Sequence, residues 1–80
     1  MSQNNLLSLR HMTVGQEGEI VKIAGGRFMK ERLAARGVRP GKKLKKVSGA
    51  MMRGPIVFEI EKIQIAIGQI MARHIIVKII

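Results

Sequence analysis

Few residues of this chain could carry out chemistry, and the residue types that are missing exclude several reactions. The 80 residues include no Cys and no Asp, so the chain holds neither a thiolate nucleophile nor a Ser-His-Asp triad. The sequence GxxxxGK[ST], which forms a phosphate-binding loop, is also absent. We therefore predict that the protein is not an enzyme.

The remaining candidates for metal ligands are two histidines and five glutamates. Their spacing contains no His pair at i and i+4, no His-x-His and no carboxylate cluster, which are the patterns that hold transition metals. We therefore predict no metal site and no cofactor. The candidates weighed are His11, His74, Glu17, Glu19, Glu31, Glu59 and Glu61.

The strongest chemical signal is positive charge. The chain carries 15 Lys and Arg against 5 acidic residues, a formal net charge of +10. Such a charge attracts nucleic acid, an anionic membrane surface or an acidic protein. Only Phe28 and Phe58 are aromatic, and Phe58 is expected to face inward, so bases would find little to stack on. We expect no specific nucleic-acid binding, although a basic patch is predicted at Lys42, Lys43, Lys45 and Lys46, with Arg36, Arg39 and Arg53 around it.

The elements that would present these charges are mostly strands. Alternation of β-branched and polar residues is typical of half-buried antiparallel strands. It is clearest over residues 56–61 and 63–68, which a short connector at 61–62 would join as a hairpin. The predicted strands are residues 19–23, 42–47, 56–61, 63–68 and 75–80, with a brief helical turn over 69–73.

One convincing helix is predicted over residues 27–36, where good helix formers occur without Pro. Met29 and Leu33 would form its narrow apolar stripe. Gly25-Gly26 would end the preceding strand, since two glycines allow positive φ and a sharp change of direction, and Gly37 would end the helix in the left-handed region. A type II turn is expected at residues 39–41, with Pro at its second position and Gly at its third.

The length of the chain fits one domain. Five short strands in 80 residues cannot build two packed sheets, but they can curl into one small barrel. We therefore predict a single domain over residues 6–80, preceded by a frayed terminus over residues 1–5. We find no membrane-spanning stretch and no signal peptide, and a small chain without Cys is typical of a reducing cytoplasm.

A series of glycines, prolines and aliphatic residues carries a family resemblance. The series comprises Gly15, Gly18-Glu19-Ile20-Val21, Gly25-Gly26, Arg32-Leu33, Gly37, Pro40-Gly41, Gly54-Pro55-Ile56, Ile65-Ala66-Ile67-Gly68, Ala72 and Ile75-Ile76-Val77. In its order and spacing it resembles the FeoA family of bacterial ferrous iron transport. The resemblance implies a mostly-β fold, a small five-stranded SH3-like barrel with one short helix inserted after the first strand.

The resemblance also implies a function. Members of the family are cytoplasmic accessory proteins of the FeoB-type membrane GTPase-permease, and they are related to the C-terminal domains of metal-dependent repressors. The chain departs from many members at two places. Gly54 is followed directly by Pro55, where many members have an intervening acidic residue, and Gly68 stands where many members have Arg.

With the resemblance in view, we expect the chain to dock on the cytoplasmic GTPase region of an FeoB-type transporter, at the inner face of the membrane, where anionic lipid could assist. A weak homo-oligomer is left open. Leu33 is either part of this docking surface or plain core, the core being the more ordinary role. A small basic nucleic-acid-binding barrel and a metal-sensing regulatory module are the alternative functions. The predicted partner-binding residues are Leu33, Arg36, Arg39, Met51, Met52 and Arg53.

Overall fold

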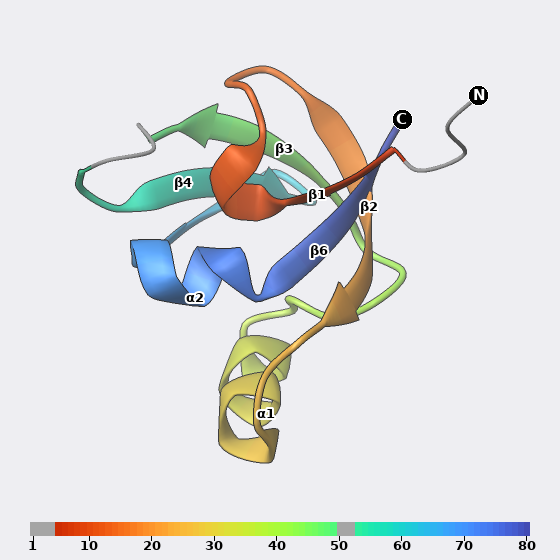
Figure 1. Ribbon diagram of the computed structural model, residues 1–80, viewed down its shortest axis with the longest axis vertical. Helices are drawn as coiled ribbons and strands as arrows, with labels where there is room; N and C mark the ends of the chain where they lie inside the picture. Colours follow the sequence, from red (N-terminus) through yellow and green to blue (C-terminus); the bar gives the residue numbers. More distant parts are fainter. Residues whose placement is uncertain (1–4, 50–52) are drawn as a thin grey trace.

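The computed structural model describes residues 5–49 and 53–80, which form one antiparallel sheet with short helices beside it (Figure 1). The six strands lie in the order β1-β6-β2-β3-β4-β5. No helix within these described residues is long and apolar enough to cross a membrane. The elements are β1 (Leu6–Ser8), the 3-10 helix η1 (Leu9–His11), β2 (Glu17–Ile23), α1 (Arg27–Ala35), β3 (Lys43–Ser48), β4 (Ile56–Ile60), β5 (Ile63–Ile67), α2 (Gln69–Arg73) and β6 (Ile75–Ile79).

The mostly-β prediction, with a helix after the first predicted strand, is confirmed, but the five-stranded barrel is wrong in two respects. Leu6–Ser8 forms an additional strand, β1, which pairs with β6. Three residues are too few to show a period-two pattern, so the sequence did not reveal this strand. Within the described residues no ladder joins β1 to β5. The sheet is therefore open and has two edge strands.

The inward-facing residues of the sheet form one hydrophobic core. Phe58 of β4 belongs to this core and is fully buried, as its alternation with Glu59 predicts. Strands from both halves of the sheet, η1 and α1 all contribute to the same cluster. Its other fully or almost fully buried members include Leu9, Ile20, Leu33, Val38, Ile56, Ile75 and Val77.

A β-bulge explains the run of aliphatic residues near the end of β2. The register of β2 against β6 shifts between Ile20 and Lys22, so that Val21 is an extra residue on its strand. Ile20 and Ile23 are both buried, whereas Val21 is 41% exposed. The bulge thus turns Val21 outward, where it lines a cavity with Lys30 and Ala34 of α1.

The predicted turns after α1 and between β4 and β5 are confirmed. Gly37 has a φ of +86°, and Gly41 has a φ of +96°, which is the conformation that the third position of a type II turn requires. The Lys42 backbone N–H donates to the Arg39 carbonyl at 3.2 Å and closes that turn. Glu61 and Lys62 both have positive φ, as expected of a two-residue hairpin connector.

The glycine pair before α1 acts differently from the prediction. β2 ends before the pair, as predicted, but neither Gly25 nor Gly26 has the positive φ that glycine allows. Gly26 instead precedes the first residue of α1 in an extended conformation. A Cβ on Gly25 would lie 2.6 Å from the Met29 sulfur. Gly25 therefore leaves space for the Met29 side chain, which packs against the core.

Lys46 corrects the prediction of a basic patch over β3. Its side chain is 1% exposed, because β3 alternates and Lys46 lies on the same face as buried Leu44. The Lys46 ammonium donates to the Met12 carbonyl at 2.6 Å and to the Arg10 carbonyl at 3.3 Å. No carboxylate faces it among the described residues. Lys46 is therefore a buried structural cation that joins β3 to the segment after η1.

Burial gives the stability of the fold a measurable pH dependence. Desolvation lowers the pKa of Lys46 below its ordinary value of 10.5. Between the folded-state pKa and 10.5, the unfolded state binds more protons at this group, so stability rises with pH across that window. Below the folded-state pKa, the cost of burying the charged Lys46 side chain lowers the stability of the fold by its full amount.

We expect urea unfolding to show the wild type gaining stability relative to Lys46→Met as the pH is raised from about 7 toward 10.5. The Lys46→Met reference cancels the titration of the other lysines. If the unfolding free energy of the wild type relative to Lys46→Met stays constant or falls as the pH rises, the result would contradict the burial of this charge.

Candidate docking surface

Glutamates of the neighbouring strands lie opposite the outward lysines of β3. In the strand registers, Lys45 of β3 lies opposite Glu17 on one side and Glu59 on the other, and Lys43 lies opposite Glu19. Opposite charges on neighbouring strands attract weakly, by about 0.2–1 kcal/mol a pair. The outward lysines of β3 therefore do not form the uncompensated patch that the sequence predicts.

The two remaining glutamates have cationic partners of their own. Glu61 accepts a hydrogen bond from Lys42 at 2.9 Å, and Glu31 accepts one from Arg27 at 3.3 Å. Every one of the five acidic residues of the sequence thus lies opposite or beside a cation. Arg32 of α1, and Arg36 and Arg39 just after it, hold positive charge that no carboxylate of the described residues balances.

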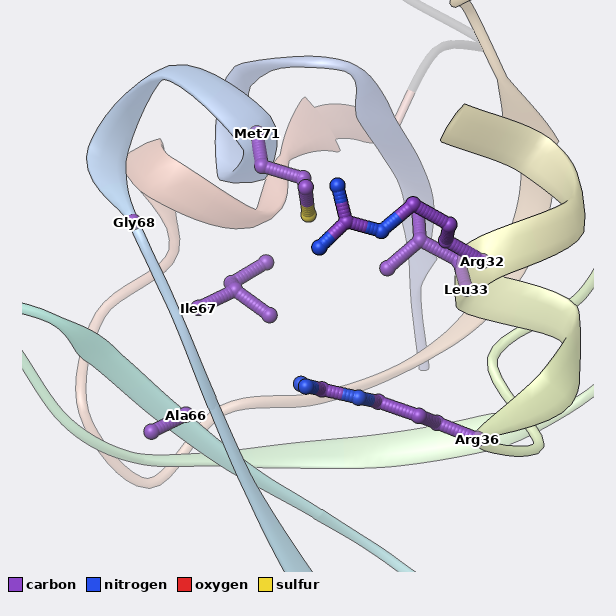
Figure 2. A pocket seen from close by; sticks show the side chains of 7 residues that line it. All are labelled: Arg32, Leu33, Arg36, Ala66, Ile67, Gly68 and Met71. Carbon is purple, nitrogen blue, oxygen red and sulfur yellow. The ribbon is translucent and has the colours of Figure 1, made fainter. Parts of the chain in front are cut away.

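A cavity of about 180 Å³ lies between α1 and the end of β5. Figure 2 shows Arg32 and Arg36 reaching from α1 into this space, toward Met71 of α2 and toward β5. Neither guanidinium has a hydrogen-bond or ion-pair partner within the described residues. The rest of the lining is uncharged: Leu33, Ala66, Ile67, Gly68 and Met71.

Packing rather than local sequence holds α1 in place. Its N-terminus lacks a side-chain cap and an acidic residue in the first turn, and Arg27 there opposes the helix dipole. Leu33, which is 1% exposed, anchors α1 to the core. At the other end the Val38 N–H donates to the Leu33 carbonyl at 2.9 Å. The helix is therefore fixed on its buried side, with Arg32 and Arg36 on the adjoining surface.

The other wall of the cavity is fixed by Gln69. The Gln69 amide donates to the Gly54 carbonyl at 2.9 Å and accepts from Arg10 at 3.0 Å, so α2 is tied both to the start of β4 and to η1. At the end of α2, the His74 ring nitrogen Nδ1 is 2.9 Å from the Ile70 carbonyl oxygen. His74 therefore caps this helix.

The structure separates the predicted partner-binding residues. Leu33 is buried and belongs to the core, while Arg36 reaches the cavity beside it. Arg39 lies on the other flank of α1, where it lines a second cavity of about 300 Å³ with Val21 and Val38. Arg53 is exposed just before β4. The predicted residues Met51 and Met52 lie outside the described residues.

Arg32 is the surface residue that the sequence analysis did not single out for docking. It precedes Arg36 by four positions, and residues at i and i+4 share one face of a helix. The four-residue spacing of Arg32 and Arg36 was therefore the feature of the sequence that could have identified Arg32. Phe28 and Ile70, 83% and 69% exposed, add apolar surface on α1 and α2.

The described residues contain no group of three or more His or acidic side chains that could hold a metal ion. Phe28 is the single exposed aromatic ring among them, because Phe58 is in the core and no Tyr or Trp occurs. The surface therefore offers arginines and aliphatic groups. Over the part of the chain that the structure describes, it offers neither a ligand cluster nor a base-stacking platform.

Solved structures with the same fold are known. A crystal structure described as an iron uptake regulatory protein (FeoA) is 27% identical over 94% of this chain and 99% of its own, with a TM-score of 0.87. The solution structure of an FeoA protein from Chlorobium tepidum is 24% identical over 92% of this chain and 70% of its own, with a TM-score of 0.83. A manganese-dependent transcriptional repressor also matches at 18% identity and a TM-score of 0.87, and the chain spans 45% of that protein.

The search for similar curated proteins found none. The family comparison is decisive, because the FeoA domain model matches residues 7–79, nearly the whole chain. The chain belongs to the FeoA domain family, a family of non-enzymatic accessory domains linked to ferrous iron uptake.

Proposed function

We propose that this chain is a cytoplasmic accessory protein of bacterial ferrous iron transport, which docks on an FeoB-type membrane GTPase-permease and modulates it. The observation that carries the proposal is the FeoA domain match over residues 7–79. The surface supports it, because a rigid sheet presents exposed arginines and apolar side chains, the kinds of group that proteins use to bind acidic partners. Docking and modulation then need no chemistry on this chain.

The net positive charge of the chain determines which surfaces attract it. With a net charge of +10, the chain is attracted to an acidic protein surface and to the anionic cytoplasmic leaflet. Arg32, Arg36 and Arg39 would face the transporter, while strands β2, β3 and β4, in which glutamates lie opposite lysines, face away. Arg36 and Arg39 are the residues proposed to make the contact, with Arg53 at its margin.

Binding to the purified FeoB-type transporter tests the proposal, with the chain immobilised and salt held near 150 mM. We expect saturable binding and a changed rate of GTP hydrolysis by the transporter. Arg36→Glu/Arg39→Glu should weaken binding by about tenfold or more, because two charge-assisted contacts become repulsive. Lys43→Glu/Lys45→Glu changes the net charge equally, away from α1, and serves as the matched control.

The same assay separates the alternatives. Tight, sequence-selective binding of an oligonucleotide that persists at about 200 mM salt would replace docking with nucleic-acid recognition. A stoichiometric Fe(II) or Zn(II) site in calorimetry would favour a metal-sensing module. An absence of binding to the transporter at micromolar concentrations would contradict the proposal.

A further inference from the structure

A groove runs along β5 beneath α1. Two adjoining cavities, of about 180 and 360 Å³, share Arg36 and Ala66 in their lining. Together they extend from Ile63 at the start of β5 to Met71 in α2. We call this feature the α1–β5 groove, with β5 and α2 on one side and Arg32, Leu33 and Arg36 on the other (Figure 2).

β5 forms an edge of the sheet along this groove. It pairs with β4 on one side and with no strand of the described residues on the other. Natural edge strands are commonly blocked by charged residues or Pro, because an open edge pairs with any extended chain. Residues 63–67 contain neither, and Ile63 is 64% exposed. The β5 edge is therefore open to an added strand.

Arg32 and Arg36 restrict what can be added. Neither guanidinium group has a hydrogen-bond or ion-pair partner among residues 5–49 and 53–80, and no acidic residue lines either cavity. A basic segment would be repelled, and pairing with the β5 edge of a second copy would bring four arginines together. An acidic segment would gain charge-assisted, bidentate hydrogen bonds.

The apolar part of the lining favours a peptide over a phosphate backbone. Ile63 and Ala66 of β5 are exposed and Met71 of α2 is half-buried, so they offer aliphatic surface along the groove, and Met adapts its shape to different side chains. An extended peptide places alternate side chains on one face, so acidic and aliphatic residues can reach both kinds of surface. A nucleic-acid backbone cannot pair with the edge of a sheet.

We propose that the α1–β5 groove binds an extended acidic segment of a partner protein, which adds to β5 as a strand and places carboxylates on Arg32 and Arg36. The inference rests on the proposed docking function and names the chemistry of the partner. β5 supplies the main-chain pairing that gives affinity, and the arginines supply the selection.

The test uses the full chain and a short labelled peptide of alternating glutamate and valine with blocked ends. We expect binding with a Kd below about 1 mM, and we expect slower amide exchange in β5 when the peptide is bound. Arg32→Gln/Arg36→Gln should weaken binding by about tenfold or more. Lys43→Gln/Lys45→Gln removes the same charge from the outer face of β3. This control should change the affinity for the peptide by less than about threefold.

Several results would overturn the groove assignment. These are no binding of the glutamate peptide, equal binding of a glutamine-valine peptide, equal losses in the two double variants, or unchanged exchange in β5. An oligonucleotide that displaces the peptide at about 150 mM salt would identify phosphate as the ligand.

The same variants separate this inference from the proposed function. If Arg32→Gln/Arg36→Gln still binds the transporter as the wild type does, the groove assignment fails and docking stands. If the wild type binds the peptide but not the transporter, the proposed function fails and the groove assignment stands.

Discussion

Phe58→Ala is expected to lower the free energy of unfolding by about 3–5 kcal/mol, the usual cost of removing a buried aromatic ring. The Phe58 side chain is fully buried, and its strand lies between β3 and β5. A domain of this size has a stability near the low end of about 5–15 kcal/mol. The variant should therefore be largely unfolded well below the denaturant midpoint of the wild type, as urea titration followed by circular dichroism would show.

Phe28→Ala provides the matched control, since these are the only two aromatic residues of the chain. Phe28 is 83% exposed, so its loss should change stability by no more than about 0.5 kcal/mol. Equal destabilisation by the two substitutions would contradict the burial of Phe58 in the core.

Lys46→Glu should destabilise the fold by about 3–5 kcal/mol, the range measured when a buried charge is left without compensation. The substitution replaces an ammonium with a carboxylate that faces the carbonyl oxygens of Arg10 and Met12. Those carbonyls lose their donor, and the new charge is repelled by them. Urea unfolding at neutral pH measures the loss.

Lys45→Glu makes the same change of charge at the neighbouring, exposed position. Its new carboxylate would face Glu17 and Glu59, at a cost of about 1 kcal/mol. The comparison isolates burial from charge, because the two variants have the same net charge. A Lys46→Glu variant as stable as Lys45→Glu would mean that the Lys46 side chain lies outside the core.

The sequence was sufficient to predict most of the sheet. Alternation in β4 and β5 placed Phe58 inward, and the turn residues Gly37 and Gly41 have the backbone angles that their positions predict. Five strands lie within two residues of their predicted ranges. The glycine and aliphatic pattern also predicted the family, which the match over residues 7–79 confirms.

The charge distribution was harder to predict, because it depends on which strands are neighbours. Lys46 was assigned to a surface patch from its four-lysine context, although period two from Leu44 places it inside. The glutamates opposite Lys43 and Lys45 come from β2 and β4, and only the register brings them there. A run of cations in sequence is therefore a weak guide to the potential of a sheet.

The open edge was also hidden from the sequence. Five strands suggested closure into a barrel, which removes edges, whereas the observed order leaves β1 and β5 unpaired on their outer sides within the described residues. The position of α1 beside β5 depends on the burial of Leu33, a tertiary contact that helix propensity does not specify. The groove with its two arginines follows from both facts.

The central claim is that this domain acts by docking through its α1–β5 side. The most direct test is an amide NMR titration of the isotope-labelled chain with the cytoplasmic GTPase region of an FeoB-type transporter. The account predicts chemical-shift changes that concentrate in α1, β5 and α2 and that approach saturation. Shifts confined to β1 and β6, or an unchanged spectrum with the GTPase region in excess, would contradict it.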